Sequence, residues 1–239
     1  MHHVVIRQKI IDRVLARRGR YHLFEWFDAA ETALVVIDMQ PTFVASDSPG
    51  EVPASRGIVD NINILADSLR AEGVAVIWVT HANGRVGGGS DWNGFFDHFV
   101  DEEVREKTIE SLAPGSPDTL LWEGLNVHGD DLHIFKNRYS ALIPGSSSLE
   151  RVLRAQGIKN IFIAGTKTNV CCEATGRDAM MLDFNTVMVS DCLAALSDEE
   201  HLAALETFIQ QFGDVLTYEE AIELVGPHAN RAVPLSPDV

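Results

Sequence analysis

The stretch that decides the fold runs from Asn160 to Leu182 and reads NIFIAGTKTNVCCEATGRDAMML. Its first residues, Asn160–Ala164, are apolar and partly β-branched, which is typical of a strand buried on both faces of a parallel sheet. From Cys171 to Leu182 the pattern favours a helix. A strand that turns into a helix within a few residues is half of a βαβ unit, and the same alternation recurs along the chain.

The alternation begins at Ala33 and continues nearly to the end of the chain. The expected strands are Ala33–Ile37, Val74–Val79, Leu132–Phe135, Asn160–Ala164, Thr186–Val189 and Asp214–Thr217. The expected helices are Ile58–Ala71, Ser148–Ala155, Cys171–Leu182, Ser197–Phe212 and Tyr218–Val225. One helix between successive strands implies right-handed crossovers. We therefore expect an α/β fold with three layers (α/β/α), a mainly parallel six-stranded sheet and Rossmann-like topology.

Two segments differ from this alternation. Residues 1–29 are locally basic and carry apolar side chains at helical spacing. They are expected to form an amphipathic arm that packs on the body or on another subunit, with a mitochondrial presequence as the alternative. Residues 30–239 are expected to form a single domain. Within it, residues 81–129 make a long irregular connection, of the kind that forms lids or contains short helices.

The composition limits the partners. Nineteen Lys and Arg stand against 35 Asp and Glu, a net charge of −16, which repels phosphate backbones and anionic lipid headgroups. Neither nucleic acid nor a membrane is therefore an expected partner. Three cysteines, two of them adjacent, do not suit a secreted disulfide framework. The N-terminal segment also lacks the apolar core of a secretory signal, so we expect a cytoplasmic protein.

Three chemically useful side chains follow expected strands. Asp38 follows the strand Ala33–Ile37, and Lys136 follows the strand Leu132–Phe135. Cys171 lies where the chain passes from the strand Asn160–Ala164 into the next helix. Sites in such sheets lie beyond the carboxyl ends of the strands. A helix N-terminus lowers the pKa of a thiol, so Cys171 is expected to be reactive. Each residue could instead have a purely structural role. Asp38 could cap a turn, Lys136 could be a surface charge, and Cys171 could be a buried apolar residue.

Three segments carry a family resemblance: LVVIDMQ (34–40), KNRYSAL (136–142) and AGTKTNVCCEATGRDA (164–179). Their order, spacing and strand-end positions resemble the signature regions of isochorismatase-like cysteine hydrolases. The resemblance covers nearly all of the chain from Ala33 onward. The motif Lys136-x-Arg138-Tyr139-Ser140 is most similar to the ureidoacrylate and N-carbamoylsarcosine amidohydrolase branch.

The resemblance implies an amidohydrolase that cleaves a C–N bond of a small amide or ureide through a thioester. It assigns Cys171 as nucleophile, Asp38 as its base and Lys136 as the balancing cation. It also implies a cis peptide bond between Thr166 and Lys167, with the backbone N–H groups of Lys167 and Cys171 as an oxyanion hole. Lys167 departs from the family, whose members usually carry a small residue there, and its length could alter the preference for substrate charge.

The resemblance also indicates contacts to the substrate. His81 and Asn83 follow the second strand, where relatives place polar contacts, and Tyr139 resembles a substrate-contacting tyrosine. Trp92 and Phe96 lie in the long connection and are candidates for a hydrophobic wall over a ligand. Each of the five could instead be an ordinary loop residue. Cys172 and Cys192 are interpreted as structural cysteines.

No metal or other cofactor is expected. Nicotinamidases of this superfamily bind zinc through an Asp-x-His pair and a further His, whereas Thr80-His81-Ala82-Asn83 follows the second strand here. Relatives commonly associate as dimers or tetramers, so we expect a homo-oligomer.

Two alternatives to the amidohydrolase remain open. One is an isochorismatase, which cleaves a vinyl ether by acid catalysis and lacks the nucleophilic cysteine. Another is a binding or scaffold protein that keeps the fold without turnover. A nucleotide-binding dehydrogenase is disfavoured, because the first strand runs into Asp-Met-Gln-Pro and not into a glycine-rich fingerprint.

Overall fold

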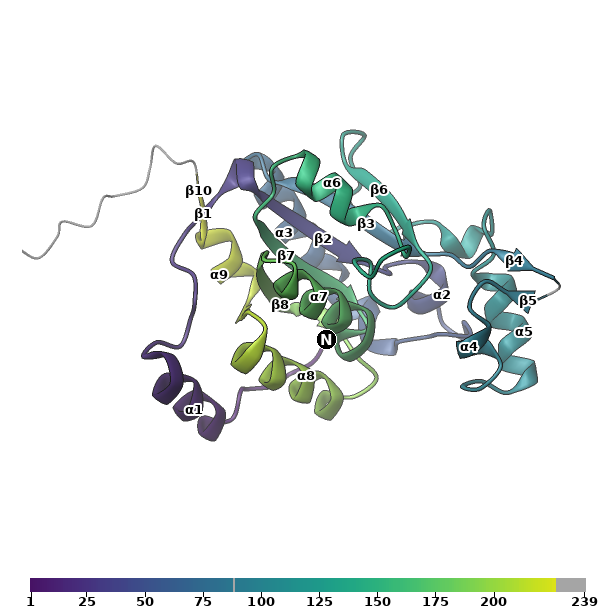
Figure 1. The fold of residues 1–239 in the computed structure, drawn as a ribbon, viewed down its shortest axis with the longest axis horizontal. Coiled ribbons are helices and arrows are strands. Elements are labelled where there is room, and N and C mark those ends of the chain that lie inside the picture. The colour runs from purple at the N-terminus through teal and green to yellow at the C-terminus, as the bar shows by residue number, and fades with distance from the viewer. Residues whose placement is uncertain (88, 227–239) are drawn as a thin grey trace, which may run out of the picture.

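A six-stranded sheet forms the centre of the computed structural model, which describes residues 1–87 and 89–226 (Figure 1). Its neighbours follow the order β6-β3-β2-β7-β8-β9, and every adjacent pair is parallel. The predicted mainly parallel six-stranded sheet is therefore confirmed. The strands are β2 (Thr32–Ile37), β3 (Ala75–His81), β6 (Leu132–Lys136), β7 (Asn160–Thr166), β8 (Asn185–Ala194) and β9 (Asp214–Leu216).

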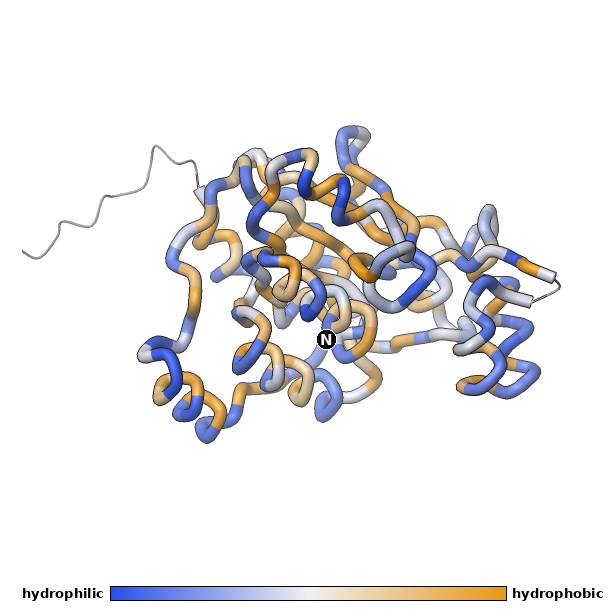
Figure 2. The backbone as a smooth tube through the Cα atoms, in the orientation of Figure 1, coloured by the Kyte–Doolittle hydropathy of each residue, from blue (hydrophilic) through white to orange (hydrophobic). Residues whose placement is uncertain are grey.

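The two central strands are buried along their whole length. All six residues of β2 and all seven of β7 are buried, as apolar runs in a strand covered on both faces must be. Hydrophobic colour accordingly concentrates in the middle of the molecule (Figure 2). Burial of such runs is the main stabilising term for the sheet.

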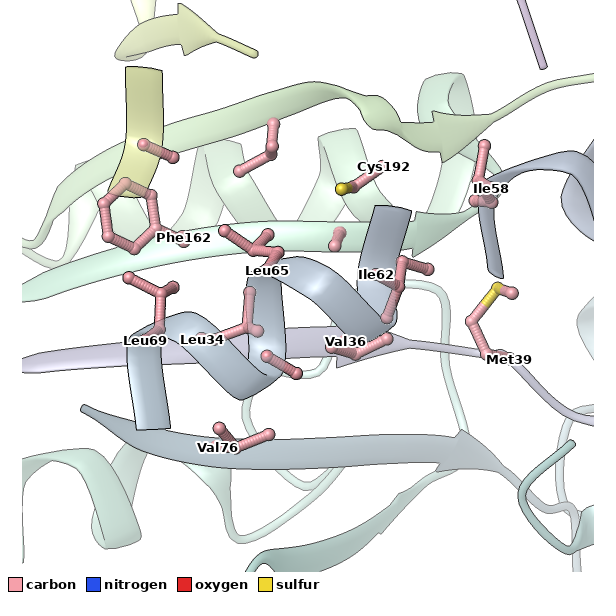
Figure 3. Close-up of a cluster of buried hydrophobic side chains, with 14 of the residues drawn as sticks. Leu34, Val36, Met39, Ile58, Ile62, Leu65, Leu69, Val76, Phe162 and Cys192 are labelled. Atoms are coloured by element: carbon pink, nitrogen blue, oxygen red, sulfur yellow. The ribbon is translucent and has the colours of Figure 1, made fainter. Parts of the chain in front are cut away.

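Helices cover both faces of the sheet, because successive side chains of a strand point to opposite sides. Leu34 and Val36 of β2 face α3 (Val59–Ala71) and α9 (Tyr218–Glu223), and Figure 3 shows Leu65 of α3 over them. The alternate residues of β2 belong to a second cluster, shared with α6 (Leu149–Ala155), α7 (Glu173–Met181) and α8 (Asp198–Gln211). The three-layer prediction is confirmed.

The strand order reverses between β2 and β7. From β2 the chain adds β3 and β6 on one side, and from β7 it adds β8 and β9 on the other. Ligands of open α/β sheets bind at the carboxyl ends of the strands next to such a reversal. Asp38 follows β2 at this edge, and Thr166 ends β7 beside it.

The N-terminal segment contains α1 (Gln8–Arg18), which packs on α8. Ile10 and Val14 are buried in the same cluster as Phe208 of α8. Arg7 Nε donates to Glu206 Oε1 at 2.7 Å. Strand β1 (Phe27–Asp28) then pairs with β10 (Val225–Gly226). The division into an arm (1–29) and a domain (30–239) stays a prediction, and residues 227–239 lie outside the described residues.

The long connection after β3 contains short helices and strands of its own, as one of the two predictions for it stated. Several of them project from one end of the molecule in Figure 1. They are β4 (Arg85–Val86), β5 (Gly89–Ser90), α4 (Asn93–Phe96), α5 (Glu102–Ser111) and the 3-10 turn Pro117–Thr119. Gly88, part of a glycine triplet in the sequence, lies outside the described residues.

The remaining short elements are α2 (Pro41–Val44) and the 3-10 turns Ala29–Glu31 and Pro53–Ile58. Across residues 1–87 and 89–226, no helix combines the length and the apolar character that a membrane crossing requires.

Candidate active site

Asp38 and Lys136 form a buried ion pair at the carboxyl edge of the sheet. Asp38 has a φ of 55°, in the left-handed region that Asp tolerates better than most residues. Its backbone N–H donates to Val79 O at 2.7 Å. Lys136 is the last residue of β6, and its Nζ lies 2.8 Å from Asp38 Oδ2, with both side chains at most 1% exposed. Removing either partner would leave an uncompensated buried charge.

Burial and mutual charge shift the pKa of both partners. Burial raises the pKa of Asp38, and the nearby Lys136 and Cys171 offset this only in part. For Lys136 burial lowers the pKa, but Asp38 and Cys171 outweigh it, so the net direction is upward. Lys136 therefore keeps its charge at neutral pH, and Asp38 is a stronger proton acceptor than an exposed carboxylate.

Cys171 lies in a π-helical turn, Thr168–Cys172, that precedes α7. The regular helix thus begins at Glu173, two residues later than the predicted start. Burial, together with the charge of Asp38, raises the pKa of the Cys171 thiol to about 12. The expected lowering of this pKa is wrong, because desolvation and a neighbouring carboxylate disfavour the thiolate more than a helix start favours it. At neutral pH the thiol keeps its proton, and a base must remove it.

The other two cysteines are buried in apolar surroundings. Cys172 has no exposed surface, and it belongs to the cluster under α7 and α8. Cys192 lies on the opposite face of the sheet, within the cluster of Figure 3. These places suit the structural role predicted for both.

A cavity of about 200 Å³ brings Asp38 and Cys171 together. Lys167 also lines it, is half-buried, and follows a cis Thr166–Lys167 peptide bond. The rest of the wall is mostly apolar. It comes from α2 and the loop after it, the end of β3 and the long connection, the segment after β6, the end of β7 and the turn before α7. Its remaining residues are Phe43, Pro49, Gly50, His81, Asn83, Trp92, Phe95, Phe96, Val100, Val104, Thr108, Leu112, Tyr139, Thr166 and Val170.

The predicted aromatic residues lie on this wall. Trp92 packs edge-on against Tyr139 at 4.7 Å between ring centroids, and it stacks on Phe95 at 5.0 Å. Phe96 is buried and lines the cavity as well. Phe95 was not among the predicted residues, although its spacing of three from Trp92 places both rings on one side of a helical turn. No pattern in the sequence indicated Phe43.

His81 and Asn83 line the cavity, but their polar atoms bind protein groups. His81 Nδ1 lies 3.2 Å from Lys136 Nζ, and its Nε2 lies 2.7 Å from Asn83 Oδ1. Burial and the charge of Lys136 hold the pKa of His81 well below its usual range. Both ring nitrogens are therefore engaged, and the ring is neutral.

These residues do not fit a zinc site. One nitrogen of His81 faces an ammonium group, which would repel a metal cation, and the other faces an amide. Among residues 1–87 and 89–226, no three His, Cys, Asp or Glu side chains are grouped so that they could hold a metal ion.

A sequence model of a protein family, the isochorismatase domain, matches residues 32–220 of the chain. The chain belongs to the isochorismatase domain family. The match spans the whole six-stranded sheet and all three signature segments, so the family resemblance predicted from those segments is confirmed.

Individual members of the isochorismatase family are similar over most of the chain. A ureidoacrylate amidohydrolase of Klebsiella pneumoniae is 29% identical over 85% of this chain and 92% of its own length. A probable inactive nicotinamidase of Arabidopsis thaliana is 33% identical over 72% of this chain and 85% of its own. The crystal structure of a cysteine hydrolase from Pseudomonas syringae pv. phaseolicola has a TM-score of 0.76 and 30% identity, covering 86% of this chain and 96% of that one.

Proposed function

We propose that the protein is a cysteine amidohydrolase that hydrolyses a C–N bond of a small amide or ureide and releases ammonia or an amine. One observation carries the proposal: Asp38, which is paired with the buried Lys136, lines the same cavity as the Cys171 thiol. The amidohydrolase and cysteine hydrolase among the similar proteins support the same class of reaction. The small cavity suits a substrate of few atoms.

In the first half of the reaction, Asp38 removes the proton of the Cys171 thiol. The raised pKa of Asp38 favours this transfer, and the ammonium of Lys136 stabilises the thiolate that forms. The thiolate attacks the carbonyl carbon, and the negative charge moves to the carbonyl oxygen. The backbone N–H groups of Lys167 and Cys171 donate to that oxygen, which is worth about 3–4 kcal/mol per donor in acyl transfer.

In the second half, the C–N bond breaks and Asp38 returns its proton to the departing nitrogen. The acyl group remains on Cys171 as a thioester. Water then attacks the thioester carbonyl, Asp38 accepts a proton from that water, and the proton passes to the sulfur as the acid leaves. Every step uses only this chain, the substrate and one water molecule.

Ammonia release from a panel of small amides and ureides tests the proposal, with isochorismate included. We expect the parent protein to release ammonia from at least one compound of the panel, and we expect Cys171→Ala to abolish that release. Turnover of isochorismate that survives Cys171→Ala would establish the vinyl ether hydrolase instead. A folded protein without turnover and without a reactive thiol would favour a binding or scaffold protein.

A cytoplasmic location and a homo-oligomer, either dimer or tetramer, belong to the same proposal. The three cysteines are free and buried, which suits a reducing compartment. Sedimentation velocity at several protein concentrations tests the assembly, and a monomer at all of them would refute it.

A further inference from the structure

The ammonium group of Lys136 faces the Asp38 carboxylate, two further acceptors and the Cys171 sulfur. Nζ lies 2.8 Å from Asp38 Oδ2, 3.1 Å from the carbonyl oxygen of Arg138 and 3.2 Å from His81 Nδ1. An ammonium has three donors and no acceptor, and this one is buried. These partners together therefore determine where its charge lies.

The hydrogen bonds beyond His81 each have a single direction. Lys136 has only hydrogens to give, so Nδ1 of His81 accepts and the ring hydrogen is on Nε2. Nε2 then donates to Asn83 Oδ1 at 2.7 Å. The Nδ2 of Asn83 donates to Asp91 Oδ1 at 2.7 Å and to Asn137 O at 3.2 Å. The chain of bonds thus ends on the carboxylate of Asp91.

We propose that His81 is a positioning residue for Lys136, held in the required tautomer by Asn83 and Asp91, and not a contact to the substrate. The inference rests on the proposed function, since it takes Lys136 as part of the reacting site. It revises the role that the sequence indicated for His81 and Asn83. Because the ring stays neutral, it remains an acceptor for the ammonium over the working pH range.

The need for such a residue arises during the reaction. When Asp38 takes the proton of Cys171, the negative charge that faces Lys136 moves from the carboxylate to the sulfur. His81 and the carbonyl of Arg138 are then the acceptors that keep the ammonium beside the sulfur. An ammonium that turned away would leave a buried thiolate without its stabilising charge.

The chain of bonds also reaches into the long connection. Asp91 directly follows β5, and its Oδ2 accepts from Asn137 Nδ2 at 3.1 Å. The next residue, Trp92, stacks on the His81 ring at 5.9 Å between centroids, and the Arg138 guanidinium lies 5.2 Å from the Trp92 ring. The place of this connection and the orientation of Lys136 are therefore linked through His81.

Alkylation of Cys171 by iodoacetamide tests the role without any turnover. The sulfur bonds to the reagent carbon and iodide leaves, and the rate reports the thiolate. His81→Leu removes the acceptor, whereas His81→Asn places an amide oxygen near the position of Nδ1. His128→Leu makes the same change at a largely exposed histidine and serves as the control. Mass spectrometry of the Cys171 peptide gives the rate constant from pH 6 to 10, and thermal unfolding monitors the fold.

The groups that titrate or carry charge around this site are Lys136, Asp38, Cys171, Tyr139, Arg138, Asp91 and Lys167. All of them remain in every variant, so a change in the pH profile reports the substituted residue. We expect His81→Leu to slow alkylation at pH 8 about 10-fold and to move its pH dependence upward, since misplaced groups typically cost 10- to 100-fold. His81→Asn should recover to within about 3-fold of the parent, and the control should match the parent.

Two results would overturn the inference. One is a His81→Leu protein that alkylates at the parental rate at every pH. The other is a pair of equally stable His81→Leu and His81→Asn proteins that are equally slow, since the amide oxygen would then not replace the ring nitrogen. A protein that hydrolyses no amide but shows the expected order of alkylation would refute the proposed function and leave the role of His81 intact.

Discussion

Nζ of Lys136 and Oδ2 of Asp38 are 2.8 Å apart, although β3 lies between their strands in the sheet. Neighbouring strands are about 4.8 Å apart, so the side chain of Lys136 extends across a full strand to reach the carboxylate. The four-carbon stem of lysine makes this span possible. His81 is the register partner of Lys136 on β3 and therefore lies along this path.

Replacing Cys171 by Ala should abolish amide hydrolysis, with a loss of at least about 10,000-fold, as for other covalent nucleophiles. The reason is that no thioester can form. The measurement is ammonia release on the best substrate of the panel. Cys172→Ala is the matched control, since Cys172 is also buried but packs in the apolar cluster. If Cys172→Ala loses turnover and Cys171→Ala keeps it, the assignment of the nucleophile is off by one residue.

Asp38→Asn should destabilise the fold by about 3–5 kcal/mol, because it leaves the Lys136 ammonium buried without a counter-charge. The free energy of unfolding from urea titration checks this. The double variant Asp38→Asn/Lys136→Met should regain much of the lost stability, since no buried charge remains, yet it should stay inactive. A double variant that hydrolyses the substrate would exclude the pair from the reaction.

The sequence predicted the central fold because its strands are apolar runs buried on both faces. For β2 and β7 the predicted and observed ends agree within two residues, since Thr32–Ile37 and Asn160–Thr166 are continuous buried runs. The paired strands β1 and β10 have two residues each and carry no such pattern. Short strands of this kind form through tertiary contacts that periodicity does not reveal.

The candidate site was predictable in part, for a related reason. Strand ends indicated Asp38 and Lys136, because a parallel sheet brings such ends to one edge. The bond between Lys136 and His81 depends on the register of two strands 55 residues apart in sequence. The direction of the Cys171 pKa shift depends on burial and on a neighbouring charge, and the local helix-start signal contains neither.

The protein should lose stability as the pH falls below about 6.5. Burial, with the charge of His2, lowers the pKa of His201 to about 3, and burial also lowers that of His81. A histidine whose pKa is depressed in the fold binds its proton more tightly in the unfolded chain. The stability that such a histidine contributes to the protein is therefore fully present above about pH 6.5 and declines below it. Each such residue adds a slope of up to about 1.4 kcal/mol per pH unit.

Urea titrations at pH 7.5, 6 and 5 measure this slope. His201→Asn should flatten it, because asparagine does not titrate and its amide can replace the bond that His201 Nδ1 makes with Thr168 Oγ1 at 2.8 Å. His128→Asn is the control at a largely exposed histidine. A slope that is the same in all three proteins would mean that His201 does not contribute to it.

Trp92 should contribute to substrate binding more than to the chemical step. Its ring lines the cavity and contacts both Tyr139 and Phe95. Removing a ring that buries apolar substrate surface costs about 1.5–3 kcal/mol, and each 1.4 kcal/mol is tenfold. Trp92→Ala should therefore raise KM about 10- to 100-fold, with kcat within about 3-fold of the parent, because binding lost equally in ground and transition states changes KM alone.

Phe99→Ala is the matched control for Trp92→Ala, since Phe99 lies in the same connection but is 76% exposed and does not line the cavity. Steady-state kinetics on the best amide of the panel separate KM from kcat for both variants. We expect Phe99→Ala to change neither constant. A fall in kcat with unchanged KM for Trp92→Ala would instead mean that the ring acts through His81, on which it stacks, because loss of Lys136 positioning lowers the chemical rate without weakening substrate binding.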